Sequence, residues 1–204
     1  MNQISSRRLG GTSGTNNWSN DQFARYIRDF ADSQSIEGCG IIAHSQGGLA
    51  ALHLYTYYWS CLDYGTSGSR MIQSVGSPYQ GTDIAGSLAS LGSVFGAGCG
   101  TNTDLTESGA AAWLSTIPTW ARNQVNYWTT SFQDNWWSYD YCNFFTDPFL
   151  SDPDDGAIEK GKGQLPYGIN RGHKSGWCHT GGMADPAQCT DSSRNSEMNA
   201  QSRY

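Results

Sequence analysis

Positive charge and long apolar runs are both scarce in this chain of 204 residues. Asp and Glu outnumber Lys and Arg by 18 to 12, and only 3 of the basic residues are lysines, so the formal net charge is -6. A surface of this kind does not neutralise a phosphate backbone, and we expect no nucleic-acid partner. No apolar run approaches the roughly 20 residues that span a bilayer, which predicts no transmembrane segment.

The start of the chain, MNQISSRRLGG, also lacks the apolar stretch of a signal peptide. The six cysteines, in contrast, are an even number and favour an oxidising compartment with about one to three disulfides. We expect Cys178 to pair with Cys189. A metal site at Cys178 and His179 is the alternative, but no CxxC or HxxxH spacing supports it. The prediction is a secreted protein whose N-terminus has been trimmed or misassigned.

Hydrophobic periodicity predicts an α/β protein. Apolar residues recur at helical spacing in SNDQFARYIRDFADSQ behind a Ser or Asn cap, and short apolar runs bounded by Gly are typical of buried parallel strands. The expected helices cover residues 19–34 and 47–59, and the expected strands cover residues 38–44, 69–78 and 140–148. Strands separated by helices indicate a mostly parallel sheet with helices on both faces, and the length suits one domain over residues 1–204.

A long segment at about residues 82–138 separates the second and third expected strands. It is too long for a simple crossover, so we interpret it as a helical insertion that forms a lid or cap. The segment is rich in tryptophan, which favours an apolar acyl pocket or a mobile lid, although each ring taken singly is better explained as a core anchor. The rings are Trp113, Trp120, Trp128, Trp136 and Trp137.

A serine directly after a buried strand carries the strongest functional signal. In AHSQGG, Ser45 follows the apolar run, and the small residues Ala43 and Gly47 stand two positions before and after it. This pattern is typical of a sharp strand-to-helix turn that lifts a nucleophilic hydroxyl out of the sheet. The backbone N–H of Gln46, at the helix N-terminus, would then stabilise an oxyanion. A serine that only caps the helix is the alternative.

AHSQGG resembles the nucleophile elbow of bacterial lipases in the α/β-hydrolase superfamily, several of which also have alanine at the first position. GSPYQGT resembles their G-T-P-H-x-G-S segment, with Tyr79 where histidine is usual, and LTESGAAAWLSTIP is similar to their insertion region. The resemblance covers about residues 20–180 and implies an α/β-hydrolase-like fold.

The same resemblance exposes a gap at the N-terminus. Lipases of this type begin with strands that carry an H-G motif, whose loop supplies a second oxyanion N–H, and this sequence contains no H-G step. Removal of one such donor costs on the order of 100- to 1,000-fold in rate. We therefore expect the N-terminal strands to be missing, with a glycine-loop N–H from RRLGGTSG as an alternative donor.

A serine nucleophile needs a histidine base and a carboxylate that orients the base. SDPDDGAIE resembles the N-D-G-L-V loop that carries the acid in these lipases, and the match falls on Asp155. Asp152 and Asp154 are near enough in sequence to be rivals. Any one of the three could instead serve as an Asx-turn residue in a loop rich in Pro and Gly.

The superfamily's chain order of serine, acid and then histidine separates the four histidines. His44 and His53 precede the acid and are expected to be packing or surface residues. His179 is the expected base, because a disulfide at the neighbouring Cys178 would hold its loop rigid. His173 is the second choice.

The resemblance implies a secreted lipase or esterase, triacylglycerol lipase-like, in which Ser45, Asp155 and His179 hydrolyse a lipid or small ester through an acyl-enzyme. No cofactor is required, but these lipases often bind a structural calcium, and the acidic loop at residues 152–155 could contribute oxygens. Two alternatives remain: acyl transfer by the same triad, and a catalytically impaired protein that binds a lipid or a partner through the Trp-rich insertion. A polysaccharide-binding module fits less well, because it would not need a serine on an elbow.

Overall fold

The computed structural model describes residues 18–65, 67–68, 71–85, 102–131, 150–151, 153–175, 179–181, 185–186 and 196. Its helices are α1 (Asn20–Ser33), α2 (Gln46–Tyr57), the 3-10 helix η3 (Thr103–Leu105), α4 (Glu107–Thr116) and α5 (Thr119–Arg122). Its strands are β1 (Ile41–His44), β2 (Ile72–Val75), β3 (Val125–Ser131), β4 (Ile169–Ser175), β5 (Thr180–Gly181) and β6 (Asp185–Pro186).

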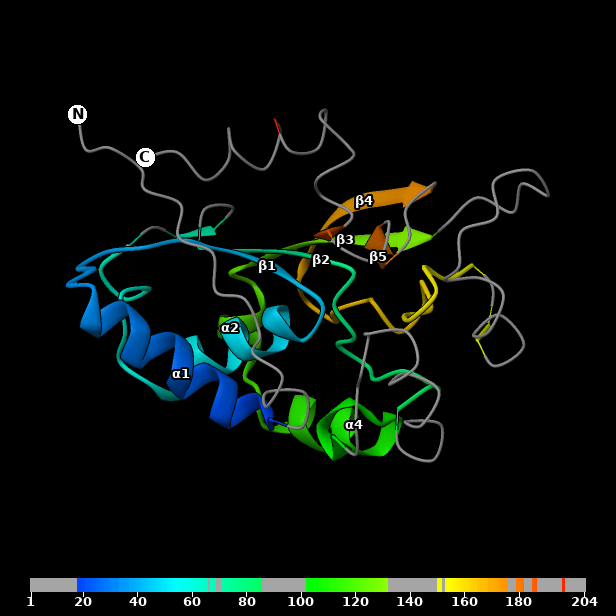
Figure 1. The fold of residues 1–204 in the computed structure, drawn as a ribbon, viewed down its shortest axis with the longest axis horizontal. Coiled ribbons are helices and arrows are strands. Elements are labelled where there is room, and N and C mark those ends of the chain that lie inside the picture. The colour runs from blue at the N-terminus through cyan, green and yellow to red at the C-terminus, as the bar shows by residue number, and fades with distance from the viewer. Residues whose placement is uncertain are drawn as a thin grey trace.

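A four-stranded sheet in the order β1-β2-β3-β4 organises this part of the chain (Figure 1). All three strand pairings are parallel, as predicted. The carboxyl ends of the strands therefore lie at one edge, where His44 of β1 pairs with Val75 of β2 and Val75 pairs with Trp128 of β3. Ligands of open α/β sheets bind at this edge. β5 and β6 form a separate antiparallel pair.

Helices α1, α2 and α4 lie on the same side of the sheet in Figure 1. α1 begins with a capping box, in which Ser19 and Gln22 each accept a hydrogen bond from the other's backbone N–H. α2 buries Leu49, Leu52 and Leu54 completely in the main core. Helices on the opposite face of the sheet stay a prediction. Among the described helices, none has both the length and the apolar character to cross a membrane.

The first two predicted strands and both predicted helices are confirmed, and the sheet contains a strand that the sequence did not predict. The sheet's third strand is β3, at Val125–Ser131, inside the segment that we interpreted as an insertion over residues 82–138. Every residue of β3 is buried, including four polar ones, so its run of β-branched and aromatic residues is explained by sheet packing. The expected strand at residues 140–148 lies outside the described residues.

The tryptophans of that segment divide between core and surface. Trp113 and Trp128 are buried, as core anchors should be, and Trp120 is 55% exposed. Trp136 and Trp137 lie outside the described residues. The lid interpretation therefore stays a prediction for the segment as a whole, with its C-terminal part corrected to a strand.

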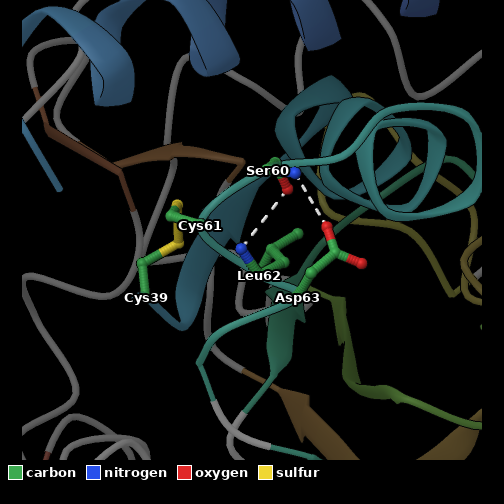
Figure 2. The surroundings of a disulfide bond; sticks show 5 residues. All are labelled: Cys39, Ser60, Cys61, Leu62 and Asp63. Carbon is green, nitrogen blue, oxygen red and sulfur yellow. Dashed lines mark hydrogen bonds between the residues drawn. A yellow bond between two sulfur atoms is a disulfide. The ribbon is translucent and has the colours of Figure 1, made fainter. Parts of the chain in front are cut away.

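A disulfide joins Cys39, just before β1, to Cys61, just after α2 (Figure 2). The backbone N–H of Cys39 also donates to the Cys61 carbonyl at 2.9 Å. Ser60, next to the disulfide, donates its N–H to the Asp63 carboxylate at 2.7 Å, which fixes the turn after α2. The expected partners Cys178 and Cys189 lie outside the described residues.

The two glycines after Ser45 and Gln46 have different surroundings. A Cβ on Gly48 would lie 2.3 Å from Ser77 Oγ and 2.9 Å from Tyr79 Oη, whereas one on Gly47 would meet only Ala43 Cβ at 3.6 Å. Tyr79 is fully buried and hydrogen bonds Ser74 at 2.7 Å, so it has no room to move away. Gly48 therefore sets how closely α2 approaches the segment after β2.

Replacement of both Cys39 and Cys61 by serine is expected to lower the free energy of unfolding by about 3 kcal/mol, because the disulfide closes a loop with a sequence separation of 22 residues. Urea denaturation followed by circular dichroism measures the change. The single variant Cys39→Ser is the control and should lose as much as the double variant. A loss below about 1 kcal/mol would show that the disulfide does not constrain the unfolded chain.

Gly48→Ala is expected to destabilise the fold by about 1–3 kcal/mol, because the new methyl group overlaps Ser77 and Tyr79. Gly47→Ala is the matched control one residue away, and it should be neutral or stabilising by up to about 1 kcal/mol through helix propensity. Thermal unfolding of the two variants compares them directly. Equal effects at both positions would contradict the packing argument.

Candidate active site at the carboxyl edge of the sheet

Ser45 has the backbone conformation of a sharp turn between β1 and α2. Its φ is 55° and its ψ is -137°, a region that residues other than glycine rarely adopt. The Ser45 N–H donates to the Val75 carbonyl at 3.2 Å, which anchors the turn to β2. Although Ser45 stands at the N-cap position of α2, its side chain makes no capping hydrogen bond. The alternative of a simple helix cap is therefore not what the structure shows.

Asp155 and His179 form a buried hydrogen-bonded pair. His179 Nδ1 lies 3.0 Å from Asp155 Oδ2, and the two side chains are 6% and 1% exposed. The His179 backbone N–H also donates to the Asp155 carbonyl at 2.7 Å, so the two residues are joined twice. Asp155 Oδ1 accepts hydrogen bonds from the N–H groups of Ala157 and Ile158 at 3.1 and 2.8 Å. The carboxylate thus has fixed donors on both oxygens.

Several donors hold the Asp155 carboxylate in its charged form. Burial by itself raises the pKa of Asp155, but the nearby His179 and the hydrogen bonds that the carboxylate accepts outweigh this effect, and the net pKa lies below its ordinary value. A charged carboxylate that accepts from Nδ1 leaves Nε2 of the imidazole free to take a proton.

Gly76 links this pair to the strand ends from which the Ser45 turn begins. His44 and Val75 are the last paired residues of β1 and β2, strands that are spaced by about 4.8 Å, and Ser45 and Gly76 follow them directly. A Cβ on Gly76 would lie 3.0 Å from Asp155 Oδ2 and 3.5 Å from His179 Nδ1. Gly76 also has a φ of 55°. Glycine therefore provides both the backbone conformation and the space that the pair occupies next to the serine.

His44, which the sequence predicts to be a packing or surface residue, is a neighbour of the site. Its ring lies against the His179 ring, with a centroid distance of 4.4 Å. Burial, and then the proximity of His179, lower the pKa of His44 to about 3, so His44 is neutral near pH 7. A neutral ring here packs against His179 without competing with it for the Asp155 carboxylate. Its position directly before the serine was the only signal in the sequence.

The rival residues have other partners or lie outside the described part. His173 contacts the Thr129 hydroxyl through Nδ1 at 2.9 Å and the Ser131 hydroxyl through Nε2 at 3.0 Å. Asp154 accepts a hydrogen bond from the Gly156 N–H at 2.7 Å, which is an Asx-turn arrangement. Asp152 lies outside the described residues. Of these candidates, the structure pairs Asp155 with His179, and the catalytic roles of both stay a prediction.

Gln46 contributes two groups with different surroundings. Its backbone N–H belongs to the first turn of α2, where N–H groups have no intrahelical acceptor, and its role as an oxyanion donor stays a prediction. Its side-chain amide donates to the Trp18 carbonyl at 2.8 Å and to Asn20 Oδ1 at 3.2 Å. Asn102 donates to the same Trp18 carbonyl at 2.7 Å. The residue after Ser45 therefore connects the start of α1 to the elbow.

The expected calcium site at residues 152–155 stays a prediction, because Asp152 lies outside the described residues. Both oxygens of Asp155 already accept hydrogen bonds from protein donors, and Asp154 Oδ1 accepts from the Gly156 N–H. Within the described ranges no group of three or more His, Cys, Asp or Glu side chains could hold a metal ion.

Hydrogen bonds from the segment after β2 secure the loop that carries Asp155. Thr82 donates its hydroxyl to the Ala157 carbonyl at 2.6 Å, and the Asp83 N–H donates to Glu159 Oε1 at 3.3 Å. Glu159 is 3% exposed. Burial, with a smaller contribution from the negative charge of Asp83, raises the pKa of Glu159 to about 7. The loop therefore holds a carboxyl group that the folded state prefers to keep protonated.

Glu159→Gln is expected to stabilise the fold by about 1–3 kcal/mol at about pH 8.5 and to have little effect at about pH 5. A raised folded-state pKa means that the contribution of Glu159 is complete below 4.5 and is lost as the pH rises through about 7. Urea unfolding at both pH values measures the difference. Glu107→Gln, at the partly exposed ion pair with Lys162, is the control and should change stability by less than about 1 kcal/mol. Equal stabilisation at both pH values would contradict the assignment.

Sequence comparison assigns the chain to a family. Residues 12–202 match the family described as "Conditioned medium factor C-terminal domain". The curated protein "Conditioned medium factor" of Dictyostelium discoideum is 43% identical over 187 residues, which cover 91% of this chain. The match covers 26% of that protein, so the chain spans about a quarter of its relative's length.

Solved structures with a similar fold are lipases and an esterase. The lipase BlEst2 of Bacillus licheniformis matches in its propeptide form with a TM-score of 0.59 and 14% identity, over 91% of this chain and 40% of that one. Its mature form matches with a TM-score of 0.54 and 16% identity, over 78% and 65%. The metagenomic carboxyl esterase MGS0156 has a TM-score of 0.57 and 14% identity, over 79% and 51%. These matches confirm the predicted α/β-hydrolase-like fold.

The predicted function, a lipase or esterase of the triacylglycerol lipase type, is wrong. The elbow is a property of the fold that many unrelated functions share, and identities of 14–16% to lipases show the fold alone. The relative that shares sequence over nearly the whole chain is named as a factor of conditioned medium. The chain belongs to the conditioned medium factor C-terminal domain family.

Proposed function

We propose that this chain is a domain of an extracellular factor that acts from the medium, and that it carries a reactive serine. The family match and the name of the Dictyostelium relative support the first part. The disulfide between Cys39 and Cys61 is in keeping with an oxidising, extracellular location. The second part rests on one observation, the buried Asp155–His179 pair beside the strained turn at Ser45.

The proposed roles follow from the chemistry of each group. As Ser45 Oγ adds to a carbonyl carbon, its proton passes to His179 Nε2, and Asp155 stabilises the resulting imidazolium through Nδ1–H. The negative charge that develops on the carbonyl oxygen is met by the Gln46 N–H at the start of α2. The leaving group then departs with the proton from His179, and water releases the acyl group from Ser45. The enzyme class proposed for the domain is therefore a serine hydrolase, with a ligand that carries an acyl group, whether a lipid or a small molecule.

The role proposed for Ser45 differs from that of the nucleophile in a lipid-degrading enzyme. In a factor, an activated serine modifies or binds a specific acyl ligand, and the protein need not turn over bulk substrate. The carboxyl edge of the sheet provides a fixed site for such a ligand, because the Ser45 turn, Gly76 and the Asp155 loop are all held by backbone hydrogen bonds.

A fluorophosphonate probe on the folded 204-residue chain is expected to label Ser45 alone, as mapped by mass spectrometry, because the probe requires an activated serine. Ser45→Ala should abolish labelling, and Asp155→Asn should slow it by roughly 100-fold or more. His179→Gln and His173→Gln form a matched pair, in which only the first should lose labelling. A folded chain that is not labelled would leave a domain that binds without reacting and would overturn the proposed serine chemistry.

A further inference from the structure

Thr130, near the carboxyl end of β3, donates its hydroxyl to the Asp155 carboxylate. The Thr130 Oγ1 to Asp155 Oδ2 distance is 2.5 Å, and Oδ2 is the same oxygen that faces His179 Nδ1. Thr130 is 4% exposed and Asp155 is 1% exposed, so water does not compete for this hydrogen bond. A hydroxyl and an imidazole therefore share one carboxylate oxygen in a closed space.

The Thr130 hydroxyl comes from the sheet, whereas the backbone N–H donors to this carboxylate come from the loop of Asp155 itself. The N–H groups of Ala157 and Ile158 belong to the same loop as Asp155 and would move with it. Thr130 belongs to the sheet, where its strand pairs in register with β4 through Lys174. The Thr130 hydroxyl therefore fixes the Asp155 carboxylate relative to the strands, and hence relative to Ser45.

We propose that Thr130 is a positioning residue, whose hydroxyl holds the charged Asp155 carboxylate with Oδ2 aimed at His179 Nδ1. This inference rests on the proposed roles of Ser45, His179 and Asp155. The hydroxyl acts through Asp155 and does not touch the ligand. A donor that is fixed in the sheet supplies the preorganisation that the loop alone does not provide.

The charged groups around the carboxylate allow its titration to report on this contact. The Thr130 hydrogen bond is one of the contacts that lower the pKa of Asp155 against the effect of burial. The titratable groups that face Asp155 are His179, which binds it, and His44, which stacks on His179. Asp154 adjoins it in the chain. The pKa of His44, about 3, lies in the same acidic range, so the signal of the Asp155 carboxyl carbon itself is what reports the loss of the Thr130 donor.

The neighbouring threonine on the same strand provides a matched control. Successive side chains of a strand point to opposite faces, and Thr129 accordingly contacts His173 Nδ1 at 2.9 Å, whereas Thr130 contacts Asp155. Both residues are buried to a similar degree. Replacement of either hydroxyl by a methyl group therefore perturbs β3 alike, and only one replacement removes a donor from Asp155.

The test compares Thr130→Val, Thr130→Ser and Thr129→Val by carbon-13 NMR titration of the Asp155 carboxyl and by the rate of fluorophosphonate labelling at Ser45. Thr130→Val is expected to move the acidic titration midpoint of the Asp155–His179 pair to higher pH. It should also slow labelling roughly tenfold, the effect of one lost hydrogen bond to a charged group. Thr130→Ser should restore both quantities, and Thr129→Val should change neither. If Thr130→Val does not fold by circular dichroism, Thr130→Ala carries the same comparison.

The two readouts separate this inference from the proposed function. An unchanged midpoint in a folded Thr130→Val protein would overturn the positioning role, as would equal shifts in Thr130→Val and Thr129→Val. A shifted midpoint in a chain whose Ser45 is never labelled would support the link from Thr130 to Asp155 while overturning the serine chemistry. A shifted midpoint with slower labelling, rescued by serine, supports both.

Discussion

The parallel register between β1 and β2 is the constraint on which the candidate site depends. It places Ser45 and Gly76 side by side, and the Ser45 N–H is fixed on the Val75 carbonyl. The chain enters α2 directly after the serine, so the turn must be sharp, and its φ of 55° reflects that demand. A slip of one residue in this register would move the serine away from the space that Gly76 leaves open.

Asp155 and His179 reach this edge from a distant part of the chain, and their position depends on many small contacts. Asp155 is held by its own loop, by the sheet through Thr130 and by both the ring and the backbone of His179. The loop is in turn fastened to the segment after β2 through Thr82 and Asp83. No single contact is large, but together they fix a charged group in a buried place, where an unpaired charge would be costly.

Local patterns predicted the parts of the fold that are local in origin. The cap of α1, the apolar run of β1, the small residues around Ser45 and the strand β2 were all readable, because each depends on neighbours in sequence. β3 and β4 were missed. β3 buries Asn126 and Thr130, whose partners Arg171 and Asp155 lie far along the chain, and β4 is largely exposed and polar. Such long-range partners leave no periodic signal in a single sequence.

The candidate site was predictable only in part, and the family was not. The serine was found from its turn, while Asp155 and His179 came from the resemblance to lipases, which supplied the chain order. Neither approach indicated His44 or Thr130 as neighbours of the pair. The resemblance also led to the wrong function, because the residues that build an elbow satisfy the geometry of the turn and do not specify a substrate.

The disulfide between Cys39 and Cys61 closes the segment around Ser45 into a covalent ring. β1, the Ser45 turn and the whole of α2 lie between the two bridged residues, so they form a covalent ring closed by sulfur and by the backbone. A protease that cut once anywhere within this ring would leave both pieces attached to each other. Ser45 would therefore remain tethered to its sheet after such a cut.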